Sequence, residues 1–293
     1  MTLEQLRIFV AVAERGHMTR AAEGLGMTQS AVSAAIRAIE THYSTRLFDR
    51  IGRGIELTDV GHRFLPEARA VLDCAATARS ALEDLSTTTG GALSIAASQT
   101  ISSYWLPRRL TAFHAAYPNV RLNVSVGNTR QVENAVAEGA ADLGLVEGRT
   151  HHPALSRQRV DHDRLLLVVS SAHPLHPSLA SGDLDILALS WVIREEGSGT
   201  RDALEDLARR EGTALERLRI FLVLPSNEAV REAVGAGAGA TIISEHVVAR
   251  DIEAGALTPI PIELPRREFA LVRHRGRYET TAQRALVSML GEE

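Results

Sequence analysis

The segment from Thr58 to about Leu85 follows one continuous helical pattern. Asp59 lies at its start, where a negative charge is favourable, and Pro66 inside it predicts a bend or a lost backbone hydrogen bond. A helix of this length is more typical of a connector or dimerisation element than of a compact core. The turn-rich residues STTTGG at 86–91 then predict the main domain boundary.

The length and composition predict a globular protein with more than one domain. The chain has 293 residues, of which 45% are hydrophobic and 23% are charged. No apolar run approaches the roughly 18 residues of a membrane span, and the first residues lack the order of a signal peptide. Cys74 is the single cysteine, so an internal disulfide is excluded, and we expect a reducing, cytoplasmic location.

The basic residues of this chain are all arginines. There are 32 of them and no lysine, while the formal net charge is −4. This balance argues against a uniformly basic nucleic-acid binder, but it leaves room for a local positive patch. Each arginine is a planar fork suited to phosphate and to guanine.

Three short helical patterns precede the long one. The first covers residues 3–15 and ends at Gly16. We expect Thr19 to cap a second helix that stops near Gly26, and Thr28 to cap a third. The following stretch, RLFDRIGRGIELT, alternates apolar residues around two glycines and predicts a hairpin.

The third helix has two distinct faces. An apolar stripe is formed by Val32, Ile36, Ile39 and Tyr43. The other face is polar and carries small or amide side chains that allow close approach to base edges. Alone, such a face also suits solvent, but three helices and a hairpin together favour a winged helix-turn-helix domain at 1–58. The residues expected to contact DNA are Thr28, Gln29, Ser30, Ser33 and Arg37 on the helix and Arg50 and Arg53 on the hairpin.

After the expected linker helix at 59–89, strand and helix patterns alternate through 90–293. Successive βαβ units predict two α/β lobes with a cleft between them. We place lobe I at about 90–160 and 268–293, and lobe II at about 161–267. The histidine-rich stretch between the two sets of patterns is expected to be a loop.

Polar residues lie where several of these strands end, which is the ligand edge of an α/β sheet. The effector-binding candidates are Ser98, Gln99, Thr100, Asn128, Glu147, Arg194, Gly197, Ser198, Gly199 and Thr200. Free backbone N–H groups at helix starts favour an anion there. Ordinary helix capping is the alternative for each segment. Glu147, Glu195 and Glu196 oppose an anion unless Arg194 or Arg201 neutralises them.

Other patterns do not predict chemistry. Cys74 is expected to be a small buried hydrophobe rather than a redox sensor, and the histidines His151, His152, His162, His173 and His176 lack regular zinc-ligand spacing. The run GAGAGA at 235–240 follows a helix and precedes a strand, which is the reverse of a dinucleotide-binding fingerprint. No ordered nucleophile, base and orienting group is found, so we predict neither an enzyme nor a cofactor or metal site.

The chain resembles the LysR-type transcriptional regulators along essentially its whole length. The motifs that carry the resemblance are TRAAE, TQSAVS, IRAIE and LFDR at the N-terminus, and LPRRLTAFHAAYPNV, ADLGLVEG and SNEAVREAVGAGAGATIIS in the lobes. His17–Met18 departs from the family, which often has a serine or glycine followed by an aromatic residue there.

The resemblance implies a cytoplasmic regulator with a winged-helix DNA-binding domain and a dimerising linker helix. It also implies an effector domain of the periplasmic-binding-protein type. Such proteins form homodimers and homotetramers, built as dimers of dimers, and bind interrupted palindromes in double-stranded DNA. On this match Gln29, Ser30 and Ser33 would read bases, and Arg50 and Arg53 would contact the backbone. RNA polymerase is left open as a further partner.

The stretch REEGSGTR resembles the subgroup that regulates carbon fixation and sulfite or sulfur metabolism. This similarity suggests a small anionic effector, such as sulfite, sulfate or a phosphorylated metabolite. The competing interpretation is a stand-alone small-solute-binding protein without a DNA function, which the N-terminal helices disfavour.

Overall fold

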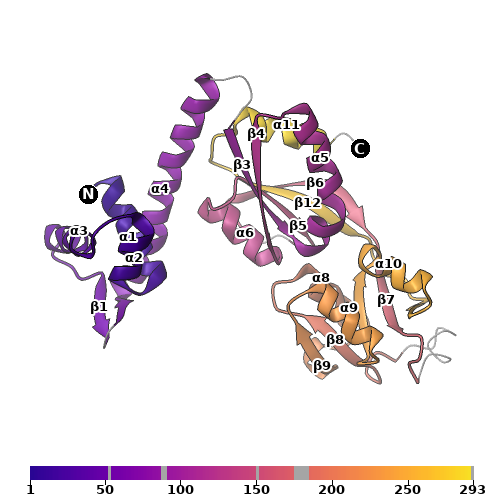
Figure 1. Cartoon of the computed structure of the whole chain (residues 1–293). Coiled ribbons are helices and arrows are strands. Elements are labelled where there is room, and N and C mark those ends of the chain that lie inside the picture. The colour runs from indigo at the N-terminus through magenta and orange to yellow at the C-terminus, as the bar shows by residue number, and fades with distance from the viewer. Residues whose placement is uncertain (52–53, 87–90, 150–151, 175–184, 292–293) are drawn as a thin grey trace. The chain divides into compact units, whose positions relative to one another are not determined.

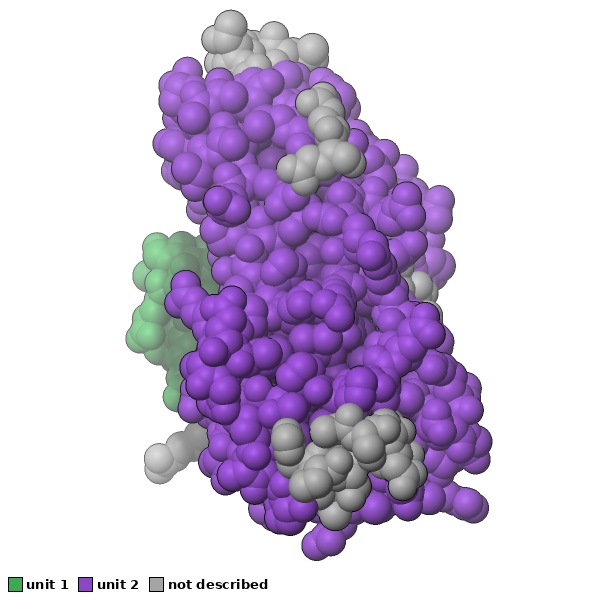
Figure 2. Space-filling view, turned by 90° about the vertical axis from the view of Figure 1, so that its right-hand side faces the viewer, with its two compact units in different colours: residues 1–86 green, residues 87–293 purple. Residues whose placement is uncertain are grey.

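The computed structural model describes residues 1–51, 54–86, 91–149, 152–174 and 185–291. Its contacts divide the chain into two compact units, Met1–Ser86 and Thr87–Glu293. Figure 1 shows their elements, and Figure 2 shows the second unit as a continuous surface. Among the described residues, no helix is both long enough and apolar enough to cross a membrane.

The first unit consists of short helices, a hairpin and one long helix. Its elements are α1 (Leu3–Arg15), α2 (Met18–Leu25), α3 (Gln29–His42), β1 (Phe48–Ile51), β2 (Gly54–Leu57) and α4 (Asp59–Ser86). Gly16 ends α1 with a left-handed φ of 58°, and the Thr28 side chain caps α3, as predicted. The expected cap of the second helix is wrong: Thr19 lies inside α2, and its N–H donates to the ring of His17, which is the N-cap.

Phe9 in α1 organises the core of this unit. Its fully buried ring lies 5.4 Å from that of Phe48 in β1 and 5.0 Å from that of Phe64 in α4, measured between ring centroids. Both pairs are tilted, a favourable arrangement for aromatic rings. The hairpin and the long helix are therefore held to the same residue of α1. Cys74, farther along α4, is exposed, so its expected burial is wrong for a single chain.

Lobe I of the second unit is a mixed sheet with helices on both faces. Its elements are β3 (Gly91–Ser98), a π-helical turn (Ile101–Trp105), α5 (Leu106–Ala116), β4 (Val120–Gly127), α6 (Thr129–Glu138), β5 (Leu143–Glu147), β6 (Leu155–Asp163), β12 (Arg267–His274) and α11 (Thr281–Leu290). The strand order is β4-β3-β5-β12-β6, with β12 antiparallel to both neighbours. α5 and α11 cover one face and α6 covers the other (Figure 1).

Lobe II has the same layered design. Its elements are β7 (Leu165–Ser170), β8 (Ser190–Arg194), α8 (Gly199–Arg210), a 3-10 turn (Leu215–Arg217), β9 (Arg219–Leu224), α9 (Asn227–Gly235), β10 (Ala240–Ser244), α10 (Glu245–Glu253) and β11 (Leu257–Ile260). The strand order is β11-β7-β10-β8-β9. α8 packs on one face, and α9 and α10 pack on the other.

Each lobe contains one tryptophan, and the two indole rings have different surroundings. The Trp105 indole of lobe I donates to Asp161 at 2.6 Å, and the Arg109 guanidinium lies 3.8 Å from its ring centroid. Burial alone would raise the pKa of Asp161, but the hydrogen bonds from Trp105 and the His162 backbone, together with Arg109, lower it. Trp191 of lobe II is fully buried and donates to the Ile186 carbonyl at 2.9 Å.

Two strands were not predicted from the sequence. β6 occupies part of the expected histidine-rich loop and carries His162, and β11 contains Pro259. Both lie at an edge of their sheets, where polar residues and proline are tolerated and the apolar alternation is weak. The chain passes from lobe I to lobe II at Arg164, directly between β6 and β7, and returns through residues 261–266.

Candidate functional site

The polar face of α3 points away from the core of the first unit. Thr28, Gln29, Ser30 and Arg37 are exposed, and Ser33 is half-buried. The Gln29 amide lies within 3.4 Å of the Ser33 hydroxyl. On the other side of the helix, Val32, Ile36 and Ile39 are buried in the core. The five helix residues expected to contact DNA therefore form one outward surface.

A groove of about 470 Å³ separates α3 from the hairpin, and Ser33, Arg37 and Arg46 line it. Glu40 fixes this arrangement, because its carboxylate accepts the Leu47 N–H at 2.8 Å and the Phe48 N–H at 3.3 Å. Glu40 was not predicted, because an acidic side chain in this helix gives no sign of a DNA contact. Of the predicted hairpin residues, Arg50 lies in β1 opposite Ile55, while its side chain and all of Arg53 lie outside the described residues.

In the second unit, Glu147 brings several predicted effector residues together. It ends β5, is only 2% exposed, and its carboxylate accepts hydrogen bonds from the Ser98 and Thr100 hydroxyls. The Thr100 bond measures 3.0 Å, and the Arg267 guanidinium lies 3.7 Å from the same carboxylate. A carboxylate therefore already occupies the point where these donors converge.

Arg267 connects this carboxylate to lobe II. Its Nη1 donates to the Thr200 hydroxyl at 3.1 Å, and its Nη2 forms an ion pair with Asp163. Asp163 also accepts a hydrogen bond of 2.8 Å from Ser244 at the end of β10. Neither Arg267 nor Asp163 was predicted, because each lies where the chain crosses between lobes and carries no local motif.

Arg194 and its neighbour Glu195 neutralise each other, a pairing that the sequence left open. Its Nε and Nη2 each donate to Glu195 at 2.8 Å, and its Nη1 donates to Asn227 at 2.6 Å. Asn227 in turn donates to Thr100 at 3.1 Å, and Asn128 donates to Glu195 at 3.1 Å. These bonds join lobe I to lobe II at two points.

The two glutamates of the EEGSGT stretch differ in their surroundings. Burial tends to raise the pKa of Glu195, but hydrogen bonds from Arg194 and Asn128 outweigh it and lower the pKa. Glu196 is exposed and forms a surface ion pair of 2.8 Å with Arg130. Both side chains thus already have partners within the protein.

The glycines of this stretch allow the lobes to approach closely. Gly197 has a φ of 87°, and a Cβ there would lie 2.9 Å from the Arg130 Cβ. A Cβ on Gly199 would lie 2.3 Å from the carbonyl oxygen of Glu147, which no real Cβ tolerates. Ser198 is the N-cap of α8 and accepts the Thr200 N–H. Residues of lobe I, Arg130 and Glu147, therefore occupy the space that side chains at these two positions would need.

Gln99 also crosses between the lobes. Its amide nitrogen donates to the Pro225 carbonyl at 3.0 Å, and its amide oxygen accepts the Asn227 N–H at 2.9 Å. With this bond, all the predicted effector residues lie in one contact region between the lobes.

Both parts of the chain match models of one family. Residues 3–62 match the bacterial regulatory helix-turn-helix protein model of the lysR family, and residues 86–293 match the LysR substrate binding domain. The chain belongs to the LysR family of transcriptional regulators. The helix-turn-helix match excludes a stand-alone solute-binding protein, and the members of this family are regulators rather than enzymes.

Named relatives agree with this family. The chain is 32% identical over 97% of its length to a probable RuBisCO transcriptional regulator of Cyanophora paradoxa, covering 89% of that protein. It is equally identical over 97% of its length to the helix-turn-helix regulator YeiE of Escherichia coli strain K12, covering 95% of that protein.

Solved structures show the same fold. Full-length CbnR complexed with its target DNA gives a TM-score of 0.70 at 22% identity, over 99% of each chain. The regulatory domain of Synechocystis CcmR in complex with 2-PG gives 0.60 at 25% identity, over 68% of this chain and 95% of that one.

The lowered pKa of Glu195 predicts a loss of stability in acid. An ionised Glu195 stabilises the lobe contact above its unfolded pKa of about 4.3, and this contribution disappears as the pH falls through the lower folded pKa. Glu195→Gln should lower the melting temperature by about 2–4 °C at pH 7 and by much less at pH 3. Thermal unfolding across this range measures the difference. The matched variant Glu196→Gln should change little; an equal effect of both substitutions, or a difference that grows in acid, would contradict the prediction.

The close approach at Gly199 predicts that any side chain there separates the lobes. Gly199→Ala should destabilise the second unit by about 1–3 kcal/mol, because the new Cβ collides with the Glu147 backbone. Gly235→Ala, whose Cβ would meet nothing within 4 Å, is the control and should be neutral or slightly stabilising. Denaturant unfolding of both variants tests this; equal stability of the two would refute the steric argument.

Proposed function

We propose that this regulator responds to a small anion, such as sulfite, sulfate or a phosphorylated metabolite, bound between its two lobes. The observation that carries the proposal is the Glu147 carboxylate, which the Ser98 and Thr100 hydroxyls and Arg267 already surround. A carboxylate and an oxyanion accept the same kind of hydrogen bonds, so these donors suit an external anion. The effector would then replace Glu147 at this point.

The relatives support a metabolite of this class. The chain resembles RuBisCO transcriptional regulators in sequence, and the similar regulatory domain of CcmR was solved with 2-PG. Binding between the lobes would favour one arrangement of lobe I and lobe II over another. The effector must bind that arrangement better than the alternative, because equal affinity for both shifts no equilibrium.

On the DNA side, we propose that Gln29, Ser30 and Ser33 read base edges while Arg37, Arg50 and Arg53 contact phosphates. The outward polar face of α3 supports these roles. An interrupted palindrome requires at least two copies of this unit, and RNA polymerase is a further partner at a promoter.

Exposed sheet edges support assembly into a homodimer or homotetramer. β4 and β9 are edge strands of their sheets, and each presents apolar side chains to the surface. Val126 is 60% exposed and Phe221 is 59% exposed. Exposed apolar edge strands are normally covered by a partner, and we propose that a second copy of the chain covers them.

The DNA interface can be tested by reversing one charge on α3. Arg37→Glu should weaken operator binding at least about ten-fold, because a phosphate contact becomes a repulsion. Arg7→Glu changes the net charge equally on the exposed side of α1 and should alter affinity by less than about three-fold. Titration by fluorescence anisotropy with promoter DNA measures both. Equal losses in the two variants would show that only net charge matters and would reject α3 as the interface.

The anion site can be tested by removing its internal competitor. Glu147→Ala should destabilise the protein by about 3 kcal/mol, since Arg267 loses a buried partner, and sulfate should restore part of this loss. The apparent Kd for sulfate should fall at least about ten-fold relative to the unsubstituted protein. Thermal shifts with sulfite, sulfate, phosphate and a sugar phosphate, against chloride at equal ionic strength, measure this. Glu147→Gln is the second variant; if neither variant distinguishes these anions from chloride, the proposal fails.

A further inference from the structure

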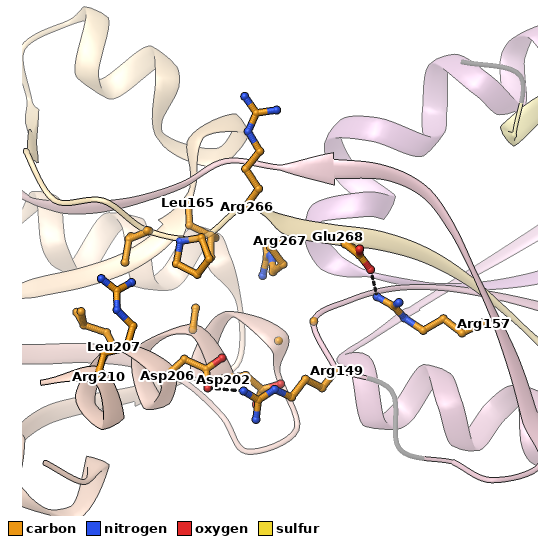
Figure 3. A pocket seen from close by; sticks show the side chains of 15 residues that line it. Arg149, Arg157, Leu165, Asp202, Asp206, Leu207, Arg210, Arg266, Arg267 and Glu268 are labelled. Carbon is orange, nitrogen blue, oxygen red and sulfur yellow. Dashed lines mark hydrogen bonds and ion pairs between the residues drawn. The ribbon is translucent and has the colours of Figure 1, made fainter. Parts of the chain in front are cut away.

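A separate cavity of about 270 Å³ lies beside the hydrogen bonds that join the two lobes, on the side of α8 (Figure 3). Of the predicted effector residues, only Gly199 lines it. The cavity is bounded by α8, by the start of β7 and by the return segment that leads into β12. Both lobes contribute to it, because Gly148 and Arg149 follow β5 while most of the remaining wall belongs to lobe II.

One part of the cavity wall is apolar. Leu165 comes from β7, Ala203 and Leu207 come from α8, and Leu264 comes from the return segment. These side chains converge from three separate elements. Pockets for small organic ligands typically combine such an apolar wall with a few polar groups that fix the orientation of the ligand.

Five arginines and three carboxylates line the cavity, which leaves an excess of positive charge. Arg149 is paired with Asp206 at 2.7 Å, and Arg157 is paired with Glu268 at 2.6 Å, as the dashed lines in Figure 3 show. Arg210 instead donates both Nη groups to the Glu263 carbonyl at 3.2 Å, a partner without a formal charge. The guanidinium of Arg210 therefore keeps its charge beside the apolar wall.

Arg267 has one side-chain N–H group without a hydrogen-bond acceptor in the described parts of the chain. It lines the cavity, is only 6% exposed, and uses its two Nη groups toward Thr200 and Asp163. Its buried Nε finds no hydrogen-bond partner among the residues that the structure describes. A buried donor without an acceptor costs free energy, and an acceptor in the adjoining cavity would remove that cost once the Arg267 side chain turned its Nε toward it.

We propose that this cavity is a second ligand site, for a small organic acid with a short branched apolar chain. The chain would lie against Leu165, Leu207 and Leu264, and the carboxylate would be held by Arg267 and Arg210. Because Arg267 also contacts Glu147 and Thr200, occupancy of the cavity would be coupled to the contact between the lobes. The site does not depend on the anion proposed above.

The test uses the full chain and two probes with the same carbon chain, one ending in a carboxylate and the other in a neutral amide. Isothermal titration calorimetry should show saturable binding of 4-methylpentanoate, at least about ten-fold tighter than that of the neutral 4-methylpentanamide. Ala203→Met narrows the cavity and should weaken 4-methylpentanoate binding at least about ten-fold, whereas Ala112→Met, on the exposed side of α5, should leave it unchanged.

A surface variant covers the case in which Ala203→Met fails to fold. Arg210→Gln should also weaken 4-methylpentanoate binding, while Arg217→Gln, exposed and outside the cavity, should not. Equal binding of acid and amide, unchanged binding in Arg210→Gln, or no saturation by about 10 mM would overturn the proposal. Stabilisation by sulfate should persist in both cavity variants; its loss would show that there is one site rather than two.

Discussion

The contact between the two lobes depends on a buried carboxylate. A charge removed from water is tolerated only when hydrogen bonds and an opposite charge surround it. Glu147 meets this requirement with Ser98, Thr100 and Arg267, and its own backbone carbonyl accepts the Thr129 hydroxyl at 2.8 Å. The end of β5, the start of β12 and the close approach of Gly199 are therefore all fixed around one residue.

Most of the fold could be predicted because its helices and central strands have strong apolar periodicity. The three N-terminal helices, the hairpin, the long α4 and the alternating elements of both lobes lie where the pattern indicated. The failures have two separate physical causes. β6 and β11 are edge strands that bury few side chains, and His17 caps α2 with a ring nitrogen in place of the usual hydroxyl.

The site was predicted only in part. Strand ends and helix starts can be recognised locally, so the sequence indicated Ser98, Thr100 and Thr200. Asp163, Asn227 and Arg267 meet these residues only because the chain crosses twice between the lobes, and no local pattern reports that crossing. For the same reason, the sequence did not reveal that Glu147 itself uses the donors expected for a ligand.

The two tryptophans give each lobe its own optical signal. Trp105 sits between a carboxylate and a guanidinium, whereas Trp191 is enclosed by the apolar core and meets only a backbone carbonyl. The emission of an indole depends on the charges and polarity near its ring, so the two side chains should differ in their wavelength of maximum emission and in their access to quenchers. Replacing either one with phenylalanine would leave a chain whose fluorescence follows a single lobe. With the two single-tryptophan variants, the rates of movement of lobe I and of lobe II could be measured separately.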